Sequence, residues 1–322
     1  MGIRVRRLLV ALAISVAVGI VAHASYSHQP TGGMSDFDQV WIAANALRHG
    51  ADPYAALRAT GWPFPLYYPL TAAVVIMPFA LLPVVWARVA FIAAGAGLLA
   101  WALGDIPKRG WAFLSGSFLG ALIFAQWSPL IVGSVALPAF FAGMVLSAKP
   151  TIGLALGFAY FLPLSRRTLW AFAGGLTTLI ASLILRPSWP SEFINAARYS
   201  PHIIAPVALL PMGPLLLLAL LRWRRPEARL LTAMALVPHT IVMYASVPLF
   251  LVPKTRMETV LLVLLADVAF GISHFFLAPK HLDPVSLAKT VRMSGQLILA
   301  LLYVPSLIMV LRRPNEVAAL EG

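Results

Sequence analysis

The sequence predicts an all-α polytopic membrane protein with about 9–12 transmembrane helices, a number obtained by counting its apolar runs. Of the 322 residues, 60% are hydrophobic and only 11% are charged, whereas soluble domains carry about a quarter charged residues. Apolar runs close to the roughly 20 residues needed to cross a bilayer recur along the chain. Neither an internal repeat nor a soluble segment interrupts them, so we expect a single integral membrane domain over residues 1–322.

The composition also excludes several kinds of chemistry. The chain contains no cysteine, which rules out disulfides, thiolate metal sites and cysteine nucleophiles. Its seven histidines lack metal-ligand spacing, so we expect no cofactor. The formal net charge is +13, but no basic soluble domain carries it, and nucleic acid is not an expected partner. Loop lysines and arginines that contact lipid headgroups, or that hold an anionic lipid substrate, account for this charge.

The first element is an apolar run from Leu8 to Ala24 that follows Arg4, Arg6 and Arg7. This pattern is typical of a signal peptide, and Ala22-His23-Ala24 resembles a cleavage site. A retained first span is the favoured interpretation, because the run is long and many apolar runs follow it. The positive-inside tendency then places the N-terminus in the cytoplasm and the first loop, residues 25–66, outside.

Ten further apolar runs follow the first outer loop: 67–83, 84–103, 111–126, 130–147, 151–164, 168–185, 207–221, 229–252, 259–278 and 295–311. The runs between 111 and 164 are short and contain prolines, so we expect tilted, kinked or partly buried helices there. Alternation from a cytoplasmic N-terminus places Arg166-Arg167, 222–229 and 280–292 inside, and the second outer loop, 186–206, and 253–258 outside. Lysine and arginine are then almost equally divided between the two sides, which supports this orientation only weakly.

A short amphipathic helix is predicted within the first outer loop. Ser35 is a suitable N-cap, Asp36 and Asp38 fall in the first turn, and Gly50 is a suitable stop. One face is apolar and is formed by Phe37, Val40, Trp41, Ala44 and Leu47. The two aspartates either complement the helix dipole or include a general base at the outer membrane surface.

Several motifs in the first half of the chain resemble those of glycosyltransferase family 87, in the GT-C superfamily. The similarity is moderately specific in combination, covers roughly residues 8–190, and leaves the remainder matching only as membrane helices. Its motifs are Ser35-Asp36-Phe37 with Trp41, Ala43-Ala44, Leu47, Gly50 and Asp52-Pro53-Tyr54; Leu66-Tyr67-Tyr68-Pro69-Leu70; Met77-Pro78-Phe79; Gln126-Trp127-Ser128-Pro129-Leu130; and Ala148-Lys149-Pro150-Thr151-Ile152-Gly153-Leu154.

The resemblance implies an inverting hexosyltransferase that uses a polyprenyl-phosphate-linked sugar, mostly mannose, and a glycolipid or polysaccharide acceptor. By its position in the motif, Asp36 is the implied catalytic base, and Asp38 is expected to have a supporting role because it points to another side of the helix. Some enzymes of this superfamily use a divalent metal, but the sequence contains no convincing cluster of ligands.

The lipid phosphate that departs in this reaction needs cationic donors. The candidates on the expected outer side are Lys149, Arg198, His202, Lys254 and Arg256, and Lys149 ranks first because it belongs to the Lys-Pro motif and stands among apolar residues. The alternative for Lys149 is a side chain that snorkels at the end of a span. Aromatic residues that bind a sugar, or that form an interfacial belt instead, are Tyr54, Trp62, Tyr67 and Tyr68.

Two polar residues lie within apolar runs. Gln126 belongs to the family-like motifs, yet the alternation of spans places it on the inner side, so either the count or a substrate role for Gln126 is wrong. Asp267 lies deep in the run 259–278, with His274 on about the same face. Ionisable groups at such depth are either functional or hydrogen-bonded packing contacts.

Three functions remain open from the sequence. The first is a plasma-membrane glycosyltransferase with its active site on the extracytoplasmic side. The second is a transporter or flippase for a lipid-linked or small polar solute, although most of the polar residues lie in outer loops rather than near midplane. The third is an inactive relative of family 87, because the chain is short for that family and its second half lacks recognisable motifs.

Overall fold

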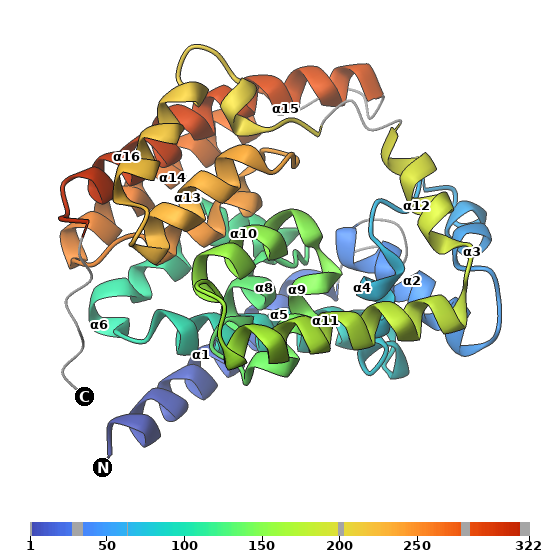
Figure 1. Cartoon of the computed structure of the whole chain (residues 1–322). Coiled ribbons are helices and arrows are strands. Elements are labelled where there is room, and N and C mark those ends of the chain that lie inside the picture. Colours follow the sequence, from blue (N-terminus) through green and yellow to red (C-terminus); the bar gives the residue numbers. More distant parts are fainter. Residues whose placement is uncertain (1, 28–34, 63, 199–202, 278–283, 316–322) are drawn as a thin grey trace. The chain divides into compact units, whose positions relative to one another are not determined.

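The computed structural model describes residues 2–27, 35–62, 64–198, 203–277 and 284–315, and these residues form helices without any strand (Figure 1). Five of its helices are apolar and long enough to cross a bilayer: Arg4–Tyr26, Val84–Leu103, Arg166–Leu185, Arg256–Phe276 and Ala288–Leu311. Large apolar side chains along the first of these, such as Val16 and Ile20, are exposed, as expected of a surface that faces lipid. The prediction of an all-helical chain is confirmed, and the five candidate spans are consistent with a polytopic membrane protein.

The candidate spans are fewer than the 9–12 that the sequence predicts. In the described residues they number five, or six if a bent pair of shorter helices crosses together. Several apolar runs form short or broken helices instead. The run 67–83, for example, contains only α4 (Leu70–Ile76) and η1 (Phe79–Leu81), because Pro69, Pro78 and Pro83 interrupt it. Apolar composition alone therefore gives more runs than the described residues have helices of spanning length.

Contacts group the chain into two compact units. Unit 1 comprises residues 1–104, 119–153 and 164–200, and unit 2 comprises residues 105–118, 154–163 and 201–322. The helices of unit 1 are α1 (Ile3–Tyr26), α2 (Asp36–Arg48), α3 (Pro53–Ala59), α4, η1, α5 (Val84–Leu103), α8 (Ser128–Ser134), α9 (Ala139–Ala148), α11 (Arg166–Leu185) and α12 (Trp189–Arg198). Two helices are divided between the units, α7 (Gly116–Ile123) and α10 (Pro150–Tyr160).

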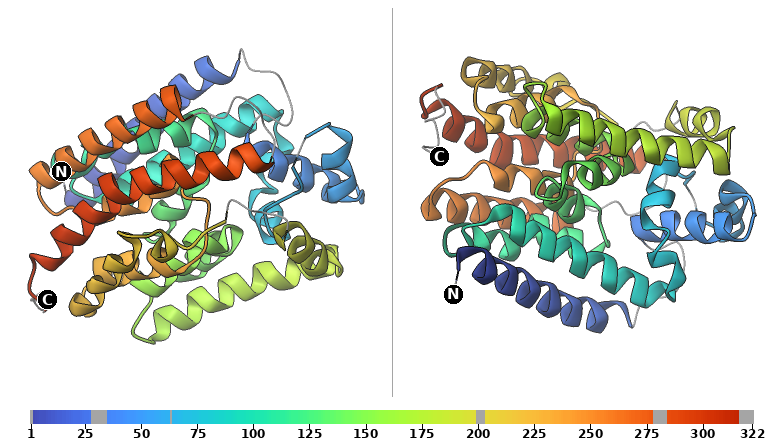
Figure 2. Two further views of the ribbon diagram at one scale, coloured as in Figure 1. Left: turned by 90° about the horizontal axis from the view of Figure 1, so that it is seen from above. Right: turned by 60° about the horizontal axis from the view of Figure 1, so that its bottom comes forward.

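The helices of unit 2 include one long composite rod. The unit contains α6 (Ile106–Arg109), η2 (Gly110–Leu114), η3 (Pro206–Ala208), η4 (Gly213–Arg222), α13 (Pro226–Leu236), η5 (Met243–Leu251), α14 (Arg256–Phe276), α15 (Pro284–Ile298), the π-helical η6 (Leu299–Tyr303) and α16 (Val304–Leu311). Figure 2 shows α15, η6 and α16 as a single continuous rod. In α14, Asp267 Oδ1 accepts a hydrogen bond from Gly116 N at 2.6 Å, and the residue is exposed.

In unit 1, the spans α1 and α5 lie side by side and antiparallel, with α1 at the edge and α8 packed on α5 (Figure 2). Near one end, Arg7 Nη2 donates to Trp101 O at 2.9 Å, and in the middle Ser15 Oγ donates to Ala93 O at 2.8 Å. Arg167, at the start of α11, donates to Val135 O at the same end of α5 and α8. Arg4, Arg6, Arg7, Arg166 and Arg167 therefore lie at one end of unit 1. α2 packs beyond the other end of α5, where further cations such as Arg48, Arg88 and Arg186 lie.

The amphipathic helix predicted in the first outer loop is confirmed as α2. Ser35 is its N-cap, and a capping box pairs the Ser35 side chain with Asp38, while Gly50 follows the C-cap with φ +66°, a value that favours glycine. The burial is more complete than predicted, since Asp38, Gln39, Ala43 and Ala46 are buried together with the apolar face. The helix is thus packed within unit 1, while Asp36, Trp41 and Leu47 remain partly exposed.

Unit 2 corrects the expected sidedness of two segments. The run 229–252, predicted as one span, consists of α13, a turn that begins after Leu236, and η5. The ammonium of Lys254 forms an ion pair with Glu227, so the beginning of α13 and the end of η5 lie at one end of the unit. The expectation that 222–229 and 253–258 lie on opposite sides of the membrane is therefore wrong. The error arose because a hairpin of two short apolar helices has the same composition as one long span.

This hairpin predicts a specific labelling pattern. The chain lacks cysteine, so single variants Arg224→Cys and Thr255→Cys each present one thiol, both at exposed positions. In intact cells, a membrane-impermeant maleimide should label either both positions or neither, and labelling should be complete after the membrane is opened. The cysteine-free chain gives the background. Labelling of one variant alone in intact cells would contradict the hairpin.

Candidate functional site

The site is built around the carboxylate of Asp36, at the first residue of α2. The capping box directs Asp38 back toward the helix start, because Asp38 Oδ2 accepts from Ser35 N at 3.0 Å and Ser35 Oγ accepts from Asp38 N at 3.3 Å. The side chain of Asp36 points elsewhere and is partly exposed. The local sequence thus separates the two aspartates into different environments.

Three side chains donate hydrogen bonds to Asp36. Its Oδ2 accepts from Gln126 Nε2 at 2.6 Å and from Tyr68 OH at 3.1 Å, and its Oδ1 accepts from Gln39 Nε2 at 3.2 Å. Gln39 lies one helical turn after Asp36, whereas Tyr68 and Gln126 come from distant segments of unit 1. These donors hold the carboxylate in one orientation.

Lys149 completes the cluster from the break between α9 and α10. Its Nζ lies 3.4 Å from both Tyr68 OH and Gln126 Oε1 and 5.4 Å from the centre of the Tyr68 ring. Burial lowers the pKa of Lys149, and the negative charge of Asp36 only partly opposes this shift. Tyr68 and Gln126 each contact both Asp36 and Lys149. The carboxylate of Asp36 and the amine of Lys149 are therefore bridged by two neutral side chains.

Gln126 reaches this cluster through a sharp bend between α7 and α8. The two helices make an angle of 113° at the break, and the residue before Gln126, Ala125, has φ +46°. The alternation of spans had placed Gln126 on the opposite side from Asp36. That placement is wrong because the run 67–83, counted as a span, contains only the short helices α4 and η1. The following helix α5 therefore starts beside α2, where Arg88 contacts Asp38, and the alternation is shifted by one crossing.

A buried aromatic cluster supports the site. Trp127, next to Gln126 in sequence, is fully buried, with its ring centre 5.8 Å from Tyr68 and 5.1 Å from Phe91. Phe91 in α5 also packs against Phe37 in α2, at 4.7 Å. Large buried rings have few accessible rotamers, so this cluster fixes Tyr68, Gln126 and α2 relative to α5.

Asp38 forms a buried ion pair with Arg88 of α5. Arg88 Nε donates to Asp38 Oδ1 at 2.6 Å and Arg88 Nη2 donates to Asp38 Oδ2 at 2.5 Å, and both side chains are fully buried. With both oxygens occupied and no exposure to solvent, Asp38 is badly placed to accept a proton from a substrate. Its environment supports a structural role, and Arg88 is a partner that the sequence analysis did not identify.

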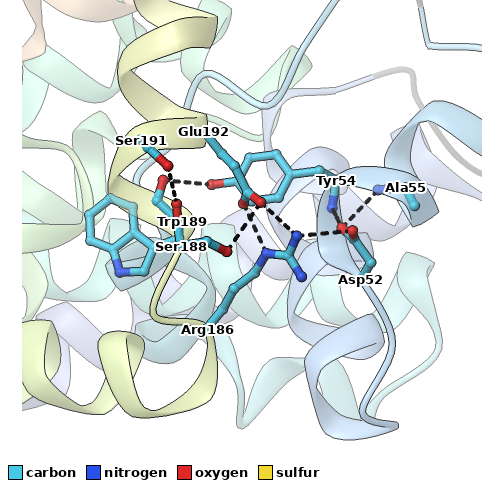
Figure 3. A network of polar contacts seen from close by, with 8 residues as sticks. All are labelled: Asp52, Tyr54, Ala55, Arg186, Ser188, Trp189, Ser191 and Glu192. Carbon is cyan, nitrogen blue, oxygen red and sulfur yellow. Dashed lines mark hydrogen bonds and ion pairs between the residues drawn. The ribbon is translucent and has the colours of Figure 1, made fainter.

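A second polar network connects residues 52–55 with residues 186–192 (Figure 3). Arg186, just after α11, donates to Glu192 Oε1 at 2.6 Å and to Asp52 Oδ2 at 3.0 Å. Burial raises the pKa of Asp52, but the backbone N–H groups of Ala55 and Tyr54, together with Arg186, outweigh it and lower the pKa overall. The predicted sugar-binding residue Tyr54 lies here. Its hydroxyl donates to Trp189 O at 3.4 Å, so its side chain is buried between α3 and α12 and is not among the contacts of Asp36.

The remaining predicted cations are separate from the Asp36 cluster. Arg198 is exposed at the last residue of α12, and His202 lies outside the described residues. Lys254 and Arg256 belong to unit 2, where the Arg256 guanidinium lies 5.1 Å from the centre of the Trp111 ring. Of the predicted site residues, the structure therefore brings together Asp36, Tyr68 and Lys149.

No family model matches the chain, and no curated protein or solved structure matches it either. Among the described residues, no group of three His, Asp or Glu side chains is placed to hold a metal ion. The resemblance to family 87 thus remains a prediction from motifs. Three of those motifs, which are far apart in sequence, contribute Asp36, Tyr68 and Gln126 to one cluster, and a fourth contributes Lys149.

Gln39 was not predicted as a site residue from the sequence. Gln126 was identified in a motif, but the span count placed it on the side opposite to Asp36. A signal for Gln39 was present, because a polar residue three positions after Asp36 lies on the same helix face. No local signal identified the Arg88–Asp38 and Arg186–Asp52 pairs, whose partners are separated by 50 and 134 residues.

Proposed function

We propose that the protein is a membrane glycosyltransferase of the GT-C type, with Asp36 as general base. The proposed donor is a polyprenyl-phosphate-linked sugar, with mannose as the first candidate, and the acceptor is a hydroxyl of a cell-envelope glycolipid or polysaccharide. The observation that carries the proposal is the convergence of Asp36, Tyr68, Gln126 and Lys149. All four come from the motifs that resemble family 87.

The proposed reaction is a single displacement with inversion. The acceptor oxygen forms a bond to the anomeric carbon while its proton passes to the Asp36 carboxylate. The bond between the anomeric carbon and the phosphate oxygen breaks, and the polyprenyl phosphate leaves with the electron pair. The leaving group gains one negative charge in this step, and the ammonium of Lys149 provides a nearby positive charge that stabilises it.

The basic N-terminal residues before the first span favour an extracytoplasmic site. Arg4, Arg6 and Arg7 stand at the start of the first candidate span, and Arg7 contacts the end of α5 that lies away from α2. Arginine is enriched on the cytoplasmic side of membrane proteins. We therefore assign the Asp36 end to the outer face and propose the plasma membrane as the location.

A transporter or flippase is the second candidate, and the bend between α7 and α8 favours it. Discontinuous helices commonly form substrate sites in transporters, and Gln126 lies at this break. A transporter would move a lipid-linked sugar or small polar solute without chemical change, so the two candidates predict different products.

The test uses the wild-type chain in membranes and in proteoliposomes. Membranes are supplied with radiolabelled polyprenyl-phosphate-mannose, and then with other lipid-linked sugars, in the presence of endogenous acceptors. Incorporation of label into a larger glycolipid or polysaccharide is the expected result. Movement of a lipid-linked sugar across the proteoliposome bilayer without transfer would establish the transporter. If no donor supports either sugar transfer or movement across the bilayer, the proposal is overturned, and the protein is an inactive relative.

A further inference from the structure

Basic side chains are concentrated at one end of unit 2, here called the basic end. It consists of the η4–α13 turn, the segment that joins η5 to α14, and the residues that follow α16. Arg222 Nε donates to Arg313 O at 2.6 Å, Arg225 Nε donates to Pro314 O at 2.6 Å, and Arg313 Nη2 donates to Glu258 Oε2 at 2.7 Å. Eight cations gather against two acids, Glu227 and Glu258; the cations are Arg222, Arg224, Arg225, Arg229, Lys254, Arg256, Arg312 and Arg313.

Five of these cations have structural partners. Arg222 and Arg225 bind backbone carbonyls at and beyond the C-terminus of α16. Arg229 binds the Ala159 and Leu162 carbonyls at the end of α10. Lys254 and Arg313 pair with the two acids. These contacts hold the segments of the basic end together and neutralise helix C-termini and carboxylates.

Three exposed arginines remain: Arg224, Arg312 and Arg256. The backbone N of Arg224 donates to Asn315 Oδ1 at 3.1 Å, so Arg224 lies beside the segment that begins with Arg312. Arg256 is the first residue of α14 and covers the ring of Trp111. The five partnered cations thus hold the segments of the basic end together, and the guanidinium groups of Arg224, Arg256 and Arg312 are exposed on it.

The neighbours of these arginines are typical of a membrane interface. Trp111 and Trp223 are 37% and 38% exposed, which means that half-exposed indoles lie next to the charges. Exposed leucines of η4 continue the surface, among them Leu218 and Leu221. Arg256 also starts α14, one of the candidate spans. Tryptophan and arginine beside the end of a span mark the level of the lipid headgroups.

We propose that the basic end of unit 2 binds the phosphate headgroups of anionic phospholipids through Arg224, Arg256 and Arg312. Guanidinium groups bind phosphate oxygens in a bidentate manner, and the adjacent indoles and leucines provide a surface for the glycerol and acyl chains. A free inorganic phosphate would use only the first of these features. The assignment does not depend on the Asp36 cluster, which belongs to unit 1.

The test compares anionic and zwitterionic lipid on the purified full chain. Native mass spectrometry counts bound phosphatidylglycerol and phosphatidylcholine on the wild type and on Arg224→Gln and Arg312→Gln, singly and together. We expect each substitution to weaken phosphatidylglycerol binding about fivefold, as expected for loss of one interfacial arginine, and to leave phosphatidylcholine unchanged. Arg58→Gln is the matched control, because it removes an equally exposed arginine from unit 1.

Two further measurements keep the outcome decisive. The thermal midpoint of each variant in detergent without added lipid verifies that it is folded, and the exposed positions predict no change. Inorganic phosphate is added alone as the second ligand. The proposal is overturned if the double variant binds phosphatidylglycerol as the wild type does, or if phosphate displaces phosphatidylglycerol at equal concentration, which would indicate a site for a free anion.

Discussion

Asp36→Asn is expected to lower sugar transfer from polyprenyl-phosphate-mannose by about two to four orders of magnitude, the usual contribution of a positioned general base. Asparagine has the same shape and keeps an oxygen for the hydrogen bonds from Tyr68 and Gln126, but it cannot accept the acceptor's proton. The measurement is the initial rate of label incorporation in membranes that contain equal amounts of wild-type and variant chain.

The control for this prediction is Asp105→Asn. Asp105 is an exposed carboxylate of unit 2 that pairs with Lys108 on the surface, so its loss removes one acidic group and leaves the rate unchanged. A detergent-solubilised sample of each variant is checked for a wild-type thermal midpoint. Transfer by Asp36→Asn at the wild-type rate would exclude Asp36 as the base even if the wild type proves to be a glycosyltransferase.

The largest expected effect on stability comes from Asp38→Asn. This change leaves the fully buried guanidinium of Arg88 without its counter-charge, and removal of one partner of a buried ion pair costs about 3–5 kcal/mol. The substitution also weakens the bond between the Asp38 side chain and Ser35 N at the start of α2. The measurement is the free energy of unfolding in mixed micelles, with Asp105→Asn as the control at an exposed ion pair.

A double substitution tests whether the destabilisation comes from the unpaired charge of Arg88 or from altered packing at position 38. Asp38→Leu with Arg88→Met replaces both charges by apolar groups and should recover most of the lost stability, because a well-packed apolar pair often replaces a buried ion pair without cost. The single change Asp38→Leu should remain unstable. If Asp38→Asn costs less than about 1 kcal/mol, the charge of Arg88 has another source of compensation, and the assigned structural role of Asp38 is wrong.

The features that the sequence predicted well are local. The N-cap, first-turn aspartates and glycine stop of α2 lie within 16 residues, and the structure contains each of them. The features that it predicted badly depend on the path of the chain. The breaks in the run 67–83 and a hairpin after Leu236 leave hydropathy unchanged but reverse the side on which the next residues emerge.

The Asp36 cluster could be predicted only in part, because its contacts also depend on the path of the chain. Asp36, Tyr68 and Lys149 could be selected because they occur in recognisable motifs, while Arg88 appeared only as a charge between two apolar runs. A buried cation can be assigned a role only when its partner is known, and here the partner is 50 residues away.

The Asp38–Arg88 pair also sets the order in which the chain can assemble. α2 precedes α5 in sequence, so during synthesis Asp38 leaves the ribosome well before Arg88. An unpaired carboxylate is too costly to bury in an apolar environment, and α2 must therefore stay in water until α5 is inserted. We therefore expect docking of α2, and with it the placement of Asp36, to follow the insertion of α5, the second long span.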